Sequence, residues 1–196
     1  MGEHQVEKTA RHRAVFLDRD GVLNRAVLRN GRPHPPGTLE EFELLPGVEE
    51  ACALLKQAGY LLVVVTNQPD VGRGTQSPAV VEAMRRKMAA LLPLDRIEVC
   101  WDAGDTTSQR RKPAPGMLLS ASQDLGIDLQ KSYVVGDRWR DINAGVAAGC
   151  AATFFIDYGY KEELRMPPDY KVASLLDAAK VILNLGQSPP TRSTPE

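Results

Sequence analysis

Five short apolar segments recur along the chain, and they limit its possible folds more than any other feature. Within them apolar residues run on, rather than alternating regularly with polar ones. Such runs are typical of strands buried on both faces, as in a parallel sheet. The sequence therefore predicts five central strands, at Ala14–Leu17, Leu61–Val65, Ile97–Cys100, Tyr133–Val135 and Ala151–Ile156.

The segments between these runs have helical patterns. The first repeats apolar residues along one helix face and then stops at a glycine, with Val48, Ala51, Cys52, Leu55 and Gly59. Further helices are predicted at 79–92, 117–125, 141–148 and 174–185. This alternation favours a three-layer, Rossmann-like α/β fold with a mainly parallel central sheet and right-handed crossovers.

A length of 196 residues favours a single domain, and we expect residues 14–186 to form it. Residues 1–13 are polar and charged and are predicted to be a flexible leader. Residues 187–196, QSPPTRSTPE, are predicted to be a disordered tail. They contain too little apolar surface to offset the entropy lost on ordering.

Charge and composition exclude several classes of partner. A formal net charge of -1 offers no electrostatic basis for binding nucleic acid or an anionic membrane. The longest apolar run is too short to span a bilayer, and the N-terminus lacks the apolar stretch of a signal peptide. The three cysteines form no Cys-x-x-Cys pair, which fits a reducing compartment. We therefore expect a cytoplasmic protein, and a monomer.

Polar motifs follow the first two predicted strands directly. Asp18 and Asp20 stand two residues apart after the first, and Gly21 permits a turn that faces both into a cleft. Thr66 and Asn67 follow the second, where a hydroxyl and free backbone N–H groups could hold phosphate oxygens. An ordinary acidic turn and a turn-forming Thr-Asn pair are the simpler explanations of these two motifs.

Two more motifs lie before a helix and after a strand. Lys112, in Arg111-Lys112-Pro113, is a compact cation suited to neutralising a phosphoryl group. Asp137 follows the fourth strand, and Asp141 lies one helical turn later. One of these acids could bind a metal while the other orients the lysine. Taken singly, Lys112 fits a solvated surface charge, and Asp141 fits a helix-starting acid.

The four motifs taken together, rather than any one of them, predict a functional site. If the sheet is parallel, all four motifs meet at the carboxyl edge of its strands, where such sheets bind ligands. Gathering four carboxylates there without a cation would be unfavourable, because like charges repel and burial desolvates them. Mg²⁺ suits such a set, since it prefers oxygen ligands and retains waters and substrate phosphate.

With these motifs in this order, the sequence resembles the haloacid dehalogenase superfamily over about residues 14–160. The resemblance implies that Asp18 is the nucleophile, that Asp20 is the general acid and base, and that Thr66 and Lys112 bind phosphate. It also implies a Mg²⁺ site made by the Asp18 carboxylate, the backbone carbonyl of Asp20 and Asp137, with Asp141 as an acidic companion. The expected activity is phosphate hydrolysis through an aspartyl-phosphate.

A narrower resemblance is to the branch that contains the heptose bisphosphate 7-phosphatases and, beside them, the histidinol-phosphate phosphatases. It rests on FLDRDGVLN, RKPAPGMLLSA and VVGDRWRDINAG. It implies little or no cap domain and a small phosphorylated sugar as substrate. Asn67 is then a further substrate-binding candidate, and Arg73, Arg111 and Arg138 are candidates for contacts with a second phosphate.

One departure from this branch concerns a structural zinc site that many of its members carry. This sequence keeps Cys100 but has Asp102, Ser108 and Arg110 at the other three ligand positions. Because structural zinc normally has four nitrogen or sulfur ligands, we predict no zinc here. Histidinol phosphate or another small phosphomonoester stays open as the substrate. A non-catalytic phosphate-binding module is a more remote alternative, because it would not need both Asp18 and Asp20.

Overall fold

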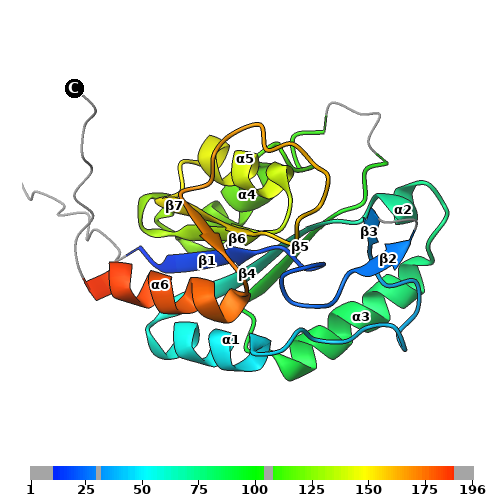
Figure 1. Cartoon of the computed structure of the whole chain (residues 1–196), viewed down its shortest axis with the longest axis horizontal. Helices are drawn as coiled ribbons and strands as arrows, with labels where there is room; N and C mark the ends of the chain where they lie inside the picture. Colours follow the sequence, from blue (N-terminus) through cyan, green and yellow to red (C-terminus); the bar gives the residue numbers. More distant parts are fainter. Residues whose placement is uncertain (1–10, 30–31, 104–107, 188–196) are drawn as a thin grey trace, which may run out of the picture.

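The structure, a computed structural model, describes residues 11–29, 32–103 and 108–187. Its centre is a six-stranded parallel sheet with the strand order β5-β4-β1-β6-β7-β8 (Figure 1). All five predicted strands are present, and a short sixth strand, which the sequence did not predict, lies at one edge. The strands are β1 (Arg13–Leu17), β4 (Tyr60–Asn67), β5 (Arg96–Cys100), β6 (Tyr133–Gly136), β7 (Ala152–Ile156) and β8 (Tyr170–Val172).

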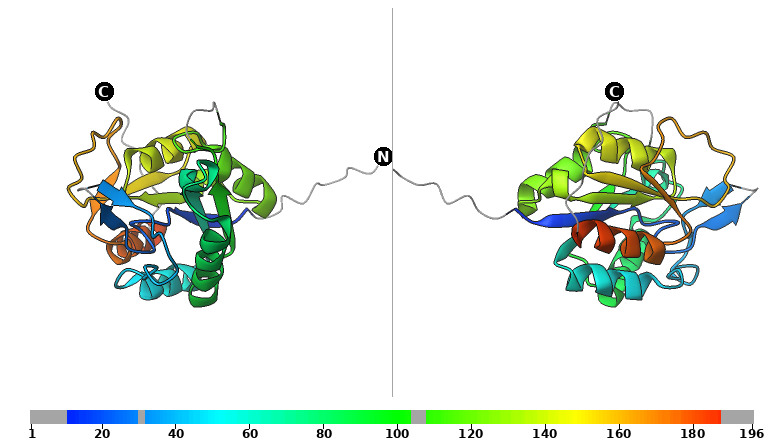
Figure 2. Two further views of the ribbon diagram at one scale, coloured as in Figure 1. Left: turned by 90° about the vertical axis from the view of Figure 1, so that its right-hand side faces the viewer. Right: turned by 60° about the vertical axis from the view of Figure 1, so that its left-hand side comes forward.

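Helices cover both faces of this sheet and complete the three predicted layers (Figures 1 and 2). Successive residues of a strand point to opposite faces, so each central strand contributes to two cores. In β1, Val15 and Leu17 pack with one helical layer, whereas Ala14 and Phe16 pack with the other. The first layer contains α1 (Val48–Gln57), α3 (Pro78–Leu91) and α6 (Leu175–Gln187), and the second contains α4 (Gly116–Leu125) and α5 (Trp139–Ala148).

The register of the central strands decides where their polar ends lie. Leu17, the last residue of β1, pairs with Val64 of β4 and with Val135 of β6. Residues that directly follow these strands are therefore level with one another at the carboxyl edge of the sheet. Strand β1 lies between two neighbours that come later in the chain, and this is the place where doubly wound sheets bind their ligands.

Only small elements are added to this framework in the described residues. A two-stranded hairpin, β2 (Val27–Arg29) and β3 (Arg32–His34), lies between β1 and α1, and a short helix, α2 (Pro69–Gly72), follows β4. A 3-10 turn spans Leu129–Lys131. The sequence did not predict these elements, which are too short to show a clear period. Their size agrees with the expected lack of a large cap domain.

The predicted ends of the domain need small corrections. Strand β1 begins at Arg13, so the last residue of the predicted leader already belongs to the sheet, and His12 forms an isolated β-bridge with Ile127. Helix α6 extends to Gln187, the first residue of the predicted tail. Residues 1–10 and 188–196 lie outside the described part. No helix within that part is long and apolar enough to cross a membrane.

Candidate active site

Lys112 is the centre of the site at the carboxyl edge of the sheet. Its side chain is only 3% exposed, and its Nζ donates to Oδ1 of Asp18 at 2.8 Å and to the carbonyl oxygen of Val65 at 2.6 Å. The same ammonium group forms an ion pair with Oδ1 of Asp141. One buried cation therefore holds carboxylates from the first and fourth motifs, which are far apart in the sequence.

The Asn67 side chain positions this lysine. Its Oδ1 accepts a hydrogen bond from the backbone N–H of Lys112 at 3.1 Å, and its Nδ2 donates to the Lys112 carbonyl at 3.0 Å. Both polar atoms of the Asn67 side chain are thus bonded to the protein's own backbone. Asn67 also lines the site, and its predicted contact with substrate stays a prediction.

Three buried carboxylates converge next to Lys112. Asp18, Asp137 and Asp141 each offer one oxygen atom, and these atoms all lie within 4.8 Å of one another. Oδ1 of Asp137 is buried and has no hydrogen-bond partner among the described residues. A buried carboxylate oxygen without a partner is strongly unfavourable unless a cation faces it. The geometry and the ligand type therefore fit the Mg²⁺ predicted from the sequence.

Two glycines permit this close approach of acidic side chains. Gly21 has a φ of 86°, and a Cβ atom there would lie 2.2 Å from Oδ2 of Asp137. A Cβ atom at Gly136 would lie 2.1 Å from Cβ of Asp141. No side chain fits at such distances, so the glycine in each motif is required for the carboxylates to reach the site.

Burial changes the ionisation of these groups. Desolvation raises the pKa of Asp18 to about 6, with smaller upward contributions from Asp141 and Asp20 and a partial downward one from Lys112. Burial also raises the pKa of Asp137, and the charges of Asp18 and Asp141 add to it. For Lys112 burial lowers the pKa, but the carboxylates of Asp141 and Asp18 outweigh it and raise the pKa. The site therefore has an excess of negative charge that a divalent cation would neutralise.

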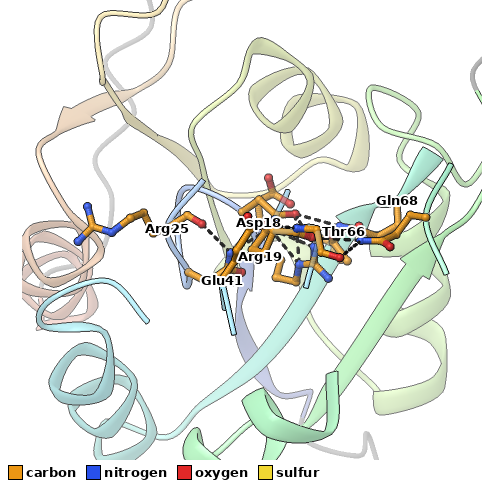
Figure 3. Close-up of polar contacts among 12 residues, drawn as sticks. Asp18, Arg19, Arg25, Glu41, Thr66 and Gln68 are labelled. Atoms are coloured by element: carbon orange, nitrogen blue, oxygen red, sulfur yellow. Dashed lines mark hydrogen bonds and ion pairs between the residues drawn. The ribbon is translucent and has the colours of Figure 1, made fainter. Parts of the chain in front are cut away.

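Arg19, Thr66 and Gln68, which are labelled near Asp18 in Figure 3, belong to a second network of hydrogen bonds, and the residue that joins this network is Asp20. Its carboxylate accepts from Nε and Nη2 of Arg19, from Nδ2 of Asn24 at 3.0 Å and from Nε2 of Gln68 at 2.9 Å. Gln68 also donates to Oγ1 of Thr66 at 2.9 Å, so it links the first motif to the second. Arg19, Asn24 and Gln68 were missed as site residues, although each stands in or next to a motif already singled out.

All ten residues predicted for the site line one cavity of about 220 Å³. Their individual roles stay predictions. Pro33 and His34 of the hairpin, Asp70 of α2 and Arg140 of α5 also line this cavity and were not predicted. Only the fold brings the hairpin and α2 to the cavity, but Arg140 could have been suspected, because it lies next to Asp141 in a predicted motif.

The three predicted substrate-binding arginines differ in their surroundings. Arg138 forms a two-pronged ion pair with both carboxylate oxygens of Glu162. Arg73 forms a more exposed ion pair with Asp70 at 3.2 Å. Arg111 donates from Nη1 to the backbone carbonyl of Asp102 at 2.7 Å. A carbonyl is uncharged, so this bond does not neutralise the guanidinium.

The segment that carries a zinc site in similar sequences contains polar contacts here. Sγ of Cys100 donates to Oδ2 of Asp102 at 3.3 Å. Glu98, which is buried, forms ion pairs with both Arg96 and Arg110 and so ties the strand β5 to the residues just before Lys112. These contacts hold part of the segment in place. The absence of zinc stays a prediction. Residues 104–107 lie outside the described part.

Comparisons with known proteins agree with this fold and site. The family model of haloacid dehalogenase-like hydrolases matches residues 36–149, and the chain belongs to this family. It is 36% identical over 183 residues to the D-glycero-β-D-manno-heptose-1,7-bisphosphate 7-phosphatase of Yersinia pestis, a match that covers 86% of this chain and 94% of that protein. It is 37% identical over 158 residues to the corresponding α-anomer enzyme of Burkholderia mallei, covering 74% and 80%.

A solved structure shows the same architecture. The D,D-heptose 1,7-bisphosphate phosphatase of B. bronchiseptica, complexed with magnesium and phosphate, superposes with a TM-score of 0.75 at 29% sequence identity. The match covers 88% of this chain and 98% of that one. Together with the family match, these similarities identify the chain as a phosphatase that hydrolyses phosphoric monoesters. The predicted superfamily and fold class are confirmed.

Proposed function

We propose that this phosphatase removes the 7-phosphate of D-glycero-D-manno-heptose 1,7-bisphosphate through an aspartyl-phosphate on Asp18, with Mg²⁺ as its cofactor. The observation that carries the chemistry is the contact between the Lys112 ammonium and the Asp18 carboxylate inside a cluster of three acids. The substrate is supported by relatives named for it that match most of this chain. Their names include both anomers, and the test below therefore includes both.

The residues of the chain divide the reaction between them. An oxygen of Asp18 attacks phosphorus in line, and the bond to the sugar oxygen breaks. Asp20 in its protonated form donates a proton to that leaving oxygen and then takes a proton from the water that hydrolyses the aspartyl-phosphate. Bound Mg²⁺, held by Asp18, Asp137 and the backbone of Asp20, would supply positive charge for the phosphoryl oxygens.

Lys112 and Asn67 contribute by pre-organisation. The Lys112 ammonium is already desolvated and held by the protein, so its positive charge is in place to stabilise negative charge on the phosphoryl group. Asn67 fixes the backbone that carries this ammonium. The Asp20 carboxylate accepts a hydrogen bond from Gln68. Asp20 must therefore give up some of the hydrogen bonds that it accepts when it carries the proton.

The test is a screen for phosphate release. The full chain is assayed with Mg²⁺ and with EDTA on both anomers of the heptose bisphosphate, on sugar monophosphates and on histidinol phosphate. We expect Mg²⁺-dependent release of one phosphate from the heptose bisphosphate with the highest kcat/KM, and no turnover by a folded Asp18→Asn variant. Preference for histidinol phosphate would reject the substrate, and wild-type activity of Asp18→Asn would reject the covalent mechanism.

Two further expectations belong to this proposal. The three cysteines are free, which supports the proposed location in a reducing cytoplasm. We also propose that the enzyme acts as a monomer. Size-exclusion chromatography with light scattering would test the monomer directly, and a stable dimer would contradict it.

A further inference from the structure

One segment outside the four motifs contacts both turns that carry the proposed metal ligands. It spans residues 157–169, between β7 and β8, and is drawn in orange beside α5 in Figure 1. The hydroxyl of Tyr158 donates to the backbone carbonyl of Gly21 at 2.9 Å, across 137 residues of sequence. Glu162 accepts two hydrogen bonds from the guanidinium of Arg138, in the fourth motif. The segment therefore joins the first motif to the fourth.

Both ends of this segment are bonded to the sheet. Its first residue, Asp157, donates its backbone N–H to the carbonyl of Val172 in β8 at 3.3 Å. Its last residue, Asp169, accepts from the backbone N–H of Thr153 in β7 at 2.8 Å and from the Thr153 hydroxyl at 2.9 Å. The contacts that the segment makes with the two motifs are thus supported by the framework of the fold.

The Tyr158 hydrogen bond acts next to a proposed metal ligand. The N–H of Gly21 belongs to the same planar peptide group as the carbonyl of Asp20, which is the proposed backbone ligand of Mg²⁺. This N–H donates to the carbonyl of Asn24 at 2.8 Å, while the carbonyl of Gly21 accepts from Tyr158. Burial raises the pKa of Tyr158, so the phenol keeps its proton at neutral pH and stays a donor. Gly21 is held on both sides, and this fixes the direction of the Asp20 carbonyl.

The Glu162 ion pair acts on the other turn in the same way. Arg138 directly follows the proposed ligand Asp137. Its backbone N–H donates to Oδ2 of Asp141 at 3.0 Å, and its guanidinium is held by Glu162. The two turns touch each other, because a Cβ atom at Gly21 would lie 2.2 Å from Oδ2 of Asp137. A shift of either turn would therefore change how the ligands face one another.

We infer that Tyr158 and Glu162 are positioning residues for the metal site, which hold the turn of the first motif against the turn of the fourth. Among the described residues, the lining of the cavity includes neither side chain, so both act through Gly21 and Arg138. This inference rests on the Mg²⁺ site of the proposed function and adds two residues that its mechanism does not use. Residues that orient metal ligands commonly change metal affinity by roughly 10- to 100-fold.

Calorimetric titration of the metal-free full chain with Mg²⁺ alone tests the role of Tyr158. Tyr158→Phe removes only the hydroxyl and keeps the ring, whose centre lies 5.5 Å from that of Tyr160. We expect Kd for Mg²⁺ to rise about threefold to tenfold, which is the effect of one net hydrogen bond. Tyr160→Phe is the matched control, because the Tyr160 hydroxyl forms no hydrogen bond within the described residues. Its Kd should equal that of the wild type.

The same titration tests Glu162. In Glu162→Gln the Arg138 guanidinium loses its charged partner, and we expect Kd for Mg²⁺ to rise about tenfold. Glu163→Gln makes the same change of charge one residue further along. Glu163 is exposed and forms no ion pair in the part of the chain that the structure describes. Its Kd should change less than about twofold.

Rescue by excess cation separates positioning from a general loss of structure. Activity is measured against Mg²⁺ concentration with p-nitrophenyl phosphate, a probe that does not depend on the sugar preferred. For Tyr158→Phe the Mg²⁺ concentration at half-maximal activity should rise by the same factor as Kd. The kcat at saturating Mg²⁺ should stay within about threefold of wild type. A lower kcat with an unchanged Kd would overturn the inference.

The outcomes for this inference and for the proposed function can be told apart. Equal Mg²⁺ affinity of the wild type, Tyr158→Phe and Glu162→Gln overturns the inference and leaves the proposed function intact. A wild type that binds no Mg²⁺ rejects both the proposed cation and the inference. Failure of the heptose bisphosphate in the substrate screen affects only the proposed function, because the titration contains no sugar phosphate.

Discussion

Nζ of Lys112 lies 2.8 Å from Oδ1 of Asp18, and the side chains of both residues are almost completely buried. The second carboxylate partner of the ammonium, Asp141, is equally buried. Stability and catalysis therefore depend on the same ion pairs. Removing one partner leaves an uncompensated charge in a desolvated site, which is far more unfavourable than losing an exposed ion pair.

We expect Lys112→Met to reduce both activity and stability. The free energy of unfolding of the metal-free protein should fall by about 3–5 kcal/mol, because Asp18 and Asp141 lose their buried counter-charge. The rate constant kcat should fall by at least about 10²-fold. Urea unfolding and phosphate release measure the two effects.

Lys56→Met is the matched control, because Lys56 pairs with Asp95 at the same 2.8 Å but in a more exposed position. Its unfolding free energy should fall by less than about 1 kcal/mol. A larger loss would contradict the argument from burial.

The raised pKa of Asp18 predicts a pH-dependent stability. Its pKa is about 6 in the folded protein, against an ordinary value of 3.8, so the folded state binds the proton more tightly. The stabilising contribution is present below about pH 4 and is lost as pH rises through about 6. Asp18→Asn avoids this loss. Without metal, its stability relative to wild type should therefore increase by about 2–3 kcal/mol between pH 4 and 7.

Urea unfolding over that pH range, with and without Mg²⁺, checks this expectation. Saturating Mg²⁺ should stabilise the wild type at pH 7 and remove most of the advantage of Asp18→Asn, because the cation binds the ionised carboxylate. A difference between the two proteins that does not vary with pH would show that Asp18 titrates normally.

Gly21→Ala should abolish the metal site through a clash rather than through backbone strain alone. The added Cβ atom would lie 2.2 Å from Oδ2 of Asp137, at a φ of 86°. Gly59→Ala is a matched control, because Gly59 has a φ of 84° and a Cβ atom added there would have no neighbour within 4 Å. Both variants should lose about 1 kcal/mol or more from strain. Only Gly21→Ala should lose Mg²⁺ binding by calorimetry, and an equal affinity in both would contradict the clash.

Glu98 should matter for the segment that lacks the zinc ligands. Glu98→Gln removes the charge that pairs with Arg96 and Arg110, and we expect a loss of about 1–3 kcal/mol in unfolding free energy. Glu43→Gln, which affects an exposed ion pair with Arg25, should change stability by less than about 1 kcal/mol. Elemental analysis of the wild type should find less than one zinc per chain, and a stoichiometric zinc would reject this explanation.

Local patterns were sufficient to predict the framework of the fold. The apolar run of β1 ends at Leu17 and the run of β6 at Val135, so parallel pairing alone places Asp18 and Asp137 at a common edge. Short elements gave no comparable signal. The hairpin Val27–Arg29 and Arg32–His34 is too short for its alternation to be recognised, and its strands carry both polar and apolar residues.

The strands, their polar ends and hence the acidic cluster follow from the amino-acid sequence, because backbone periodicity and parallel pairing bring those motifs together. The partner that each side chain contacts follows instead from the three-dimensional packing. Asn67 bonds to the backbone of Lys112 across 45 residues, and Arg138 is neutralised by Glu162 while Arg140 faces the cavity. Such choices depend on how loops and helices pack in three dimensions, which local spacing does not encode.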